Sequence, residues 1–288
     1  MNVYEILTNR IMDLLQEGEI PWRKPWKATG GARNFVSKKP YRGINQFLLN
    51  AATFSSGYWM TFKQASEKGG QVRKGEKSTM VVFWKFINTV TKDDDDPDAK
   101  GELTQVPLLR YYRVFNLDQI DGIEAPVEEQ PANHFQPIEQ AELIMMGMPY
   151  KPIIHYGGDQ ACYSPNLDRI NLPKREASSS PEEFYSTVFH ELAHSTGHPI
   201  RLKRKGILEP SYFGSHNYSQ EELVAEFASS MLCGVAGIEQ QTIENSAAYI
   251  QGWLKRLKND KKLAIIAAGQ AQRAADFILN RQDTEPRN

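Results

Sequence analysis

The chain has 288 residues, a formal net charge of −1 and two cysteines. This length allows two domains of ordinary size. Cys162 and Cys233 lack CxxC spacing, which argues against a disulfide framework and a cysteine-based metal site. The N-terminus lacks the pattern of a signal peptide, and no run of about eighteen apolar residues could span a membrane. We therefore expect a cytoplasmic protein without membrane contact.

The first part of the chain predicts a mixture of helix and strand. Apolar residues from Val3 to Leu15 recur at spacings of three and four, which predicts an opening amphipathic helix. One strand is expected from Met80 to Val90 and another from Val106 to Phe115. The acidic run at residues 93–98 between them lacks the glycine and glutamate of an EF-hand, so we expect a solvated loop.

The segment from Pro21 to Lys85 is strongly basic. It contains thirteen Lys or Arg and two Glu, a balance of +11, so the rest of the chain carries −12. Such asymmetry predicts an anionic partner, with a solvated basic face as the alternative. The cations alternate with aromatic residues, which suits unpaired bases that stack on rings beside a phosphate track. Single-stranded DNA fits better than duplex DNA, because no zinc finger, basic zipper or recognition helix is evident.

The residues expected to contact DNA are cations, rings and amides of this segment. Some rings must instead belong to the core, Trp84 first among them because it lies in an apolar run. The expected DNA contacts are Trp22, Lys24, Trp26, Arg33, Asn34, Lys39, Tyr41, Arg42, Asn45, Trp59, Lys63, Arg73, Lys74 and Lys77.

A change of composition divides the chain. Residues 124–137 are rich in Pro, Glu, Gln and Asn, which predicts a linker between domains at 1–123 and 138–288. In the second domain, residues 160–164 and 168–172 indicate short strands. The closing helices are expected at 242–258 and 261–279.

The second domain contains an HExxH motif, from His190 to His194. A serine cap at Ser180, with proline at the first helical position, predicts a helix that ends near Gly197. Histidines four apart share one helical face, so both can bind one metal ion, and Glu191 can act as general base towards water. Two neutral core histidines are the alternative, but each would then need hydrogen-bond partners.

A catalytic zinc needs a third protein ligand and an open position. The extended motif HExxHxxGxxH fails, because Ile200 stands where its third histidine would be. A second helix offers Glu222 and Glu226 on one face. We expect Glu222 as ligand, with Glu226 as an outer acid that holds a ligand histidine or as the alternative ligand. Glu221 is a weaker alternative, and Ser219 with Glu222 also fits a capping box.

This site would perform metal-assisted hydrolysis. Zinc is the expected cofactor, with manganese or another divalent ion as the alternative; it lowers the pKa of a bound water and polarises a carbonyl. Glu191 would then return the proton to the leaving amine. The donors available for the developing oxyanion are Tyr212, His216 and Tyr218. The strands at 160–164 and 168–172 could align an extended substrate.

Several blocks of sequence together resemble the ArdC-type antirestriction family. They are the motif at 190–194, Arg201-Leu202 and the acidic helix at 221–226, with N-terminal blocks at Pro21–Trp26, Arg33-Asn34, Lys39–Asn45, Tyr58–Ala65 and Val72–Lys77. The resemblance implies an α+β chain of two domains. A mixed α/β domain that binds single-stranded DNA would precede a mostly helical, zincin-like metallopeptidase domain with a small sheet.

The resemblance further implies a plasmid-encoded protein that shields incoming DNA from restriction during conjugative transfer. Its second domain would be a zinc metallopeptidase whose protein substrate is unknown and could belong to the host restriction system. A non-enzymatic protein that coats single strands, with a structural or vestigial metal site, is the alternative. The N-terminal resemblance alone also permits an accessory role in plasmid replication or priming, because this domain occurs in TraC-type primases as well.

Overall fold

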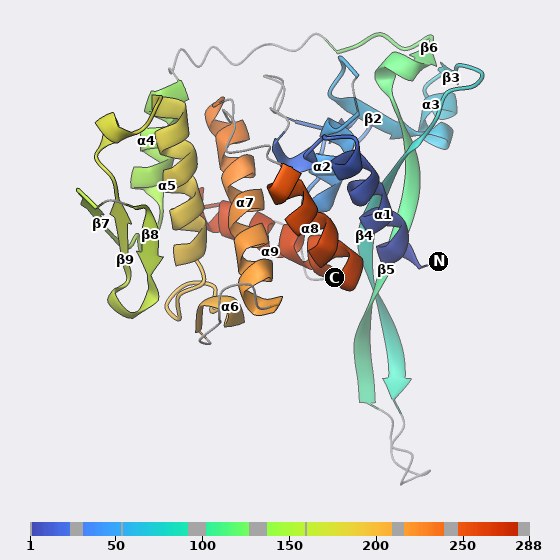
Figure 1. Ribbon diagram of the computed structural model, residues 1–288. Helices are drawn as coiled ribbons and strands as arrows, with labels where there is room; N and C mark the ends of the chain where they lie inside the picture. Colours follow the sequence, from blue (N-terminus) through green and yellow to red (C-terminus); the bar gives the residue numbers. More distant parts are fainter. Residues whose placement is uncertain are drawn as a thin grey trace.

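The computed structural model describes residues 2–23, 31–52, 54–91, 102–126, 137–158, 160–208, 216–238 and 247–281. It confirms the α+β class: an N-terminal region built on a sheet precedes a helical C-terminal region with a smaller sheet (Figure 1). Among the described helices, none is both long and apolar enough to cross a bilayer.

The N-terminal region begins with the predicted amphipathic helix, α1 (Val3–Gln16). Asn2 and Glu5 form a reciprocal capping box at its start, and its apolar stripe is buried. Two short helices follow, α2 (Ile44–Asn50) and α3 (Phe62–Glu67). This region also contains two short 3-10 helices, η1 (Pro21–Arg23) and η2 (Leu117–Gln119). A separate two-stranded sheet is formed by β3 (Gln71–Val72) and β6 (Ile120–Asp121).

The main sheet has the strand order β1-β2-β5-β4. The two predicted strands are confirmed and form a long antiparallel ribbon that extends past the helices in Figure 1. The acidic run predicted as a loop lies outside the described residues, as does the side chain of Trp84. The strands are β1 (Arg33–Asn34), β2 (Tyr58–Thr61), β4 (Thr79–Thr91) and β5 (Glu102–Asn116).

The C-terminal region places helices around a three-stranded sheet of order β7-β9-β8. α5 lies between this sheet and α7 (Figure 1). Sequence patterns indicated β8, β9, α5, α7, α8 and α9 but not β7 or α4. The elements are α4 (Pro137–Gly147), β7 (Ile153–Tyr156), β8 (Cys162–Ser164), η3 (Pro165–Leu167), β9 (Arg169–Leu172), η4 (Arg175–Ala177), α5 (Pro181–Ser195), α6 (Lys205–Leu208), α7 (His216–Ala236), α8 (Ala247–Asn259) and α9 (Leu263–Ile278).

The two halves of the chain share one hydrophobic core. Residues of α1 and α2 belong to the same buried cluster as α5, α7 and α9. Phe227 on α7 contacts Phe47 and Trp22 of the N-terminal region, with ring centroids 4.6 and 5.1 Å apart. Arg42 adds an ion pair with Asp276 on α9. The described residues of the two halves therefore bury apolar surface against each other.

Candidate metal centre

The two motif histidines come from the middle and last turn of α5. The helix begins as predicted: the Ser180 side chain accepts a hydrogen bond from the backbone N–H of Glu183, and Pro181 is the first helical residue. The rings of His190 and His194 meet with their Nε2 atoms 3.1 Å apart. Most of the apolar side chains of α5 are buried, so the helix holds both histidines in fixed positions.

Glu222 reaches the same point from α7. Its carboxylate oxygens lie 3.6 Å from the Nε2 atoms of His190 and His194. Helix α7 begins at His216, so Ser219 lies inside its first turn and the capping-box alternative for Glu222 is wrong. The structure thus brings Glu222 into one cluster with the two histidines, as predicted, and its role as a metal ligand remains a prediction.

These three residues fit a divalent cation. One ligand atom from each lies within 4.8 Å of the others. Their side chains are 12–27% exposed, so none of the three is fully buried. Two imidazoles and one carboxylate match the ligand set of a catalytic zinc site.

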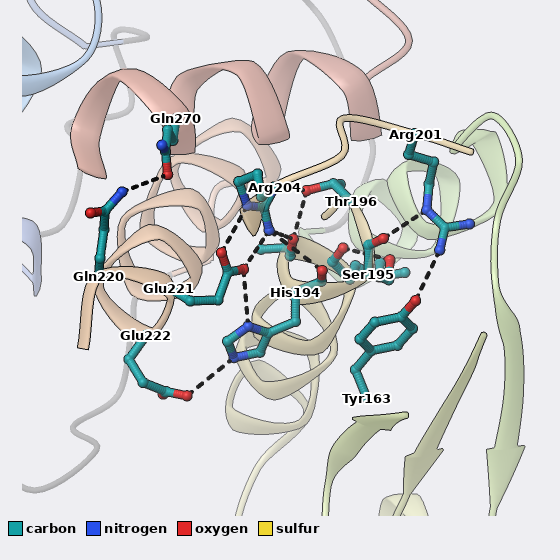
Figure 2. A network of polar contacts seen from close by, with 12 residues as sticks. Tyr163, His194, Ser195, Thr196, Arg201, Arg204, Gln220, Glu221, Glu222 and Gln270 are labelled. Carbon is teal, nitrogen blue, oxygen red and sulfur yellow. Dashed lines mark hydrogen bonds and ion pairs between the residues drawn. The ribbon is translucent and has the colours of Figure 1, made fainter. Parts of the chain in front are cut away.

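The outer acid beside His194 is Glu221. Glu221 Oε1 lies 3.3 Å from Nδ1 of His194, so the ring has one nitrogen towards each of two carboxylates (Figure 2). Such an outer partner fixes the orientation and tautomer of a ligand histidine. Glu226 was predicted to hold a ligand histidine: it does not contact His194, but its charge contributes to the raised pKa of His190. Glu226 instead accepts hydrogen bonds from Trp22 Nε1, at 2.9 Å, and from the Tyr249 hydroxyl.

Arg204 holds Glu221 in turn. Its Nε and Nη2 donate to the two oxygens of Glu221 at 2.9 and 2.5 Å, and both side chains are 6% exposed. The same guanidinium donates to Thr196 Oγ1 and to the carbonyl of Ala193, at 2.5 and 2.7 Å. Arg204 therefore ties the end of α5 to α7 (Figure 2).

A second arginine joins the end of α5 to the small sheet. Arg201 is fully buried, donates from Nε to the carbonyl of Ser195 at 2.7 Å, and pairs with Asp168 through both Nη atoms. Tyr163 on β8 bonds both to Asp168, at 2.9 Å, and to Arg201, at 3.2 Å. Sequence reasoning noted Arg201 only as part of a family block and missed Arg204; two arginines shortly after a predicted helix end were the available signal.

The charges around the cluster favour a cationic occupant. Burial acts to raise the pKa of Glu222, but the hydrogen bond from His190 and the nearby imidazoles outweigh it, and the pKa lies below its usual range. Burial also raises the pKa of Tyr218, which hydrogen-bonds to Glu222 one helical turn later. Glu222 is therefore ionised and Tyr218 protonated at neutral pH.

The remaining predicted residues of this site divide into two groups. Glu191 on α5 is buried, with 7% of its surface exposed. Its charge contributes to the raised pKa of His190 and of Tyr218. Tyr212 lies outside the described residues. His216 is the first residue of α7, and its side chain is not among those described. Among the three predicted donors, only Tyr218 therefore has a described place beside the cluster.

Four predicted DNA contacts are buried. Trp22, Trp59 and Tyr41 are 2–6% exposed, so their rings offer no face to a base, and burial contradicts a stacking role for them. The Asn45 side chain bonds to the backbone N–H and carbonyl of Val82, both at 2.7 Å, at the free edge of β4. These three rings, although cations stand near them in the sequence, therefore belong to the core.

Other predicted DNA contacts already have partners in the protein. The side-chain amide oxygen of Asn34 accepts hydrogen bonds from the backbone N–H groups of Val36 and Ser37, which builds a turn. Arg73 pairs with Glu76 and Asp121. Arg33 is half-buried. The exposed members of the predicted set include Lys39, Arg42, Lys63, Lys74 and Lys77. Lys24 and Trp26 lie outside the described residues.

Both halves of the chain match known families. Residues 1–115 match the N-terminal domain of anti-restriction factor ArdC, and residues 139–270 match a zincin-like metallopeptidase. Two proteins of Escherichia coli named DNA primase TraC are 36% and 37% identical over 96% of this chain. The chain spans only 20% and 27% of their lengths.

Relatives of similar length also exist. The uncharacterized protein y4eC of Sinorhizobium fredii (strain NBRC 101917 / NGR234) is 33% identical over the whole chain, which covers 94% of it. Crystal structures of the antirestriction protein ArdC from plasmid R388, metal-free and Mn(II)-bound, superpose with a TM-score of 0.75 each. They are 34% and 32% identical, and the chain covers 100% of both. This chain belongs to the ArdC family of antirestriction proteins, with an N-terminal ArdC domain followed by a zincin-like metallopeptidase domain.

Proposed function

We propose that this protein is a metal-dependent peptidase that also binds single-stranded DNA and protects plasmid DNA from restriction during conjugative transfer. The observation that carries the proposal is the convergence of His190, His194 and Glu222 on one point beside Glu191. A structural metal site has no use for a general base, so this arrangement favours catalysis.

The residues would hold one divalent ion, zinc or manganese. Imidazole ligands suit zinc, and a carboxylate also suits manganese, which the R388 protein binds. When bound, the ion acts as a Lewis acid towards a peptide carbonyl and activates water. Glu191 would take a proton from a water at the site and pass it to the leaving amine. The hydroxyl of Tyr218, which donates its single proton to Glu222 in this structure, would turn to donate it to the developing oxyanion.

The DNA-binding part of the proposal rests on charge and composition. The N-terminal region has a balance of +11 over residues 21–85, while the formal charge of the whole chain is −1. A match to the ArdC N-terminal domain supports a role connected with DNA. Localisation of the peptidase to entering single strands would bring it to the DNA that restriction enzymes attack.

New protein N-termini test the peptidase proposal directly. Extract of a restricting recipient strain is incubated with the metal-loaded protein, with the same protein after chelation, and with Glu191→Ala. We expect cleavage sites, detected by mass spectrometry, that occur only with the metal-loaded wild type. Identical N-termini in all three samples would contradict peptidase activity and would favour a protein that coats single strands around a structural metal site.

A further inference from the structure

One face of the β4–β5 ribbon carries uncovered aromatic rings. Phe83 on β4 and Tyr112 on β5 are 45% and 49% exposed, and their ring centroids lie 5.6 Å apart. The Phe83 ring also lies 6.2 Å from that of buried Tyr41. The rings therefore form a row that begins in the core and runs out onto the sheet surface.

The register shows which side chains share this face. Phe83 pairs with Arg110, and Val81 pairs with Tyr112. Side chains directly opposite each other lie on the same face, and successive side chains alternate between faces. Val81 is buried beneath Tyr41 in a separate small core, so one end of the face is covered and the end with Arg110 is open. We call Phe83, Arg110 and Tyr112 the aromatic face.

The aromatic face is electropositive. The segments around it, residues 31–42, 79–85 and 108–116, contain seven Lys or Arg and no Asp or Glu, and of the seven the strand register places Arg33 and Arg113 on the opposite face. Arg42 is paired with Asp276, whereas Arg110 has no ion pair within the part of the chain that the structure describes. Lys39 is exposed two residues before Tyr41. An anion with flat apolar groups complements both the charge and the rings of such a surface, whereas an acidic protein surface complements the charge without offering a base to stack on each ring.

We propose that the aromatic face is the binding surface for single-stranded DNA, with bases stacked on Phe83 and Tyr112 and a phosphate at Arg110. This inference rests on the proposed DNA-binding function and gives it residues, in place of the buried rings of Trp22 and Trp59. A single strand is required, because the bases of a duplex stack on one another and so hide the flat surfaces that would stack on the rings.

The neighbouring residues on β5 provide matched controls. Tyr111 is 46% exposed, close to the value for Tyr112, but lies on the opposite face because it pairs with Val82. Arg113 is likewise exposed on the opposite face, opposite Met80. Tyr111 is thus the control for Tyr112, and Arg113 is the control for Arg110. Each substitution to alanine removes an exposed side chain of the same type from the same strand, so an effect on folding should be similar within each pair.

The test measures the affinity of the full chain for fluorescein-labelled oligo-dT by anisotropy. Phe83→Ala and Tyr112→Ala should each weaken binding by about 5- to 150-fold, the range for loss of one stacked base. Tyr111→Ala should bind as wild type does. Arg110→Ala should reduce the slope of log affinity against log salt by about 0.7, as expected for one phosphate contact of a single strand, and Arg113→Ala should leave the slope unchanged.

Other outcomes are distinguishable. If wild type binds oligo-dT but Phe83→Ala and Tyr112→Ala bind equally well, the aromatic face is not the site, and the DNA-binding function lies elsewhere on the molecule. Equal losses in Tyr111→Ala and Tyr112→Ala would also overturn the assignment. A wild type that fails to bind oligo-dT would overturn the DNA-binding function itself. If the wild type self-associates, and Tyr112→Ala abolishes this self-association but leaves the DNA affinity unchanged, the aromatic face is a contact between two copies of the chain and the proposal is overturned.

Discussion

His194 is fixed by two acids that are neighbours in sequence but have different tasks. Glu222 lies with its carboxylate towards Nε2, where a metal would bind, and Glu221 lies towards Nδ1. Because Glu221 is itself held by Arg204, the orientation of the ring depends on a chain of buried polar contacts. Partners of this kind commonly change metal affinity by about 10- to 100-fold.

We therefore expect Glu221→Gln to weaken metal binding by at least about tenfold, because an amide is a poorer acceptor for the Nδ1–H of His194. Competition with a fluorescent chelator measures the affinity. Glu226→Gln is the control for charge: Glu226 acts on His190 through its charge but hydrogen-bonds to Trp22 and Tyr249 and not to His194, so its substitution should change the affinity much less. The reverse order would restore the role that spacing alone assigned to Glu226.

At this scale the sequence predicts residues that share one helix. His190, Glu191 and His194 follow from a spacing of four, and the structure brings Glu222 to them. The choice between Glu221 and Glu226 depends on how α7 crosses α5, which no spacing within α7 contains. Burial of Trp22 and Trp59 was unpredictable for the same reason, because a ring beside cations has the same pattern in a core as on a surface.

At the scale of elements, the turn after α5 positions the arginines. Gly197 directly follows the helix cap, and a Cβ there would lie 2.5 Å from Ile207 Cγ1 and 3.3 Å from Arg204 Nη2. Gly197→Ala should therefore displace Arg204 and destabilise the fold by about 1–3 kcal/mol through overpacking. Urea unfolding measures the loss, and metal affinity should fall with it. An alanine variant with wild-type stability would show that this turn adjusts freely.

The contact between the small sheet and α5 should respond to acid. Burial acts to raise the pKa of Asp168, but hydrogen bonds from Arg201 and Tyr163 outweigh it, and the pKa lies below its usual value. Asp168→Asn should destabilise the fold by about 3 kcal/mol at neutral pH, because buried Arg201 loses its counter-ion.

The direction of this pH dependence follows from linkage. A carboxyl whose pKa is lower in the folded state contributes its stability above the unfolded pKa, about 4, and loses it as the pH falls through the folded pKa. The difference in unfolding free energy between wild type and Asp168→Asn should therefore be constant near neutrality and shrink below about pH 4. A difference that persists unchanged in acid would contradict a stabilising charge on Asp168.

At the scale of the whole molecule, the shared core couples the two predicted domains. Phe47 and Trp22 pack on Phe227 of α7, the helix that also carries Glu222. We expect one cooperative thermal transition, with calorimetric and van't Hoff enthalpies equal, because separation of the halves would expose this core. Two resolved transitions would show that the halves are independently stable. The sequence predicted the boundary between the halves from composition, but packing across it involves contacts far apart in the chain.

The central claim is that the metal centre performs chemistry in the protective function. Transfer of a plasmid into a restricting recipient, with the wild-type protein or with Glu191→Ala, tests it most directly; a non-restricting recipient is the control. Glu191→Ala should retain its metal and its affinity for oligo-dT, because Glu191 is neither a ligand nor on the aromatic face. The account predicts that this variant loses protection only in the restricting recipient. Protection equal to that of wild type would contradict it and would leave strand binding as the sufficient activity.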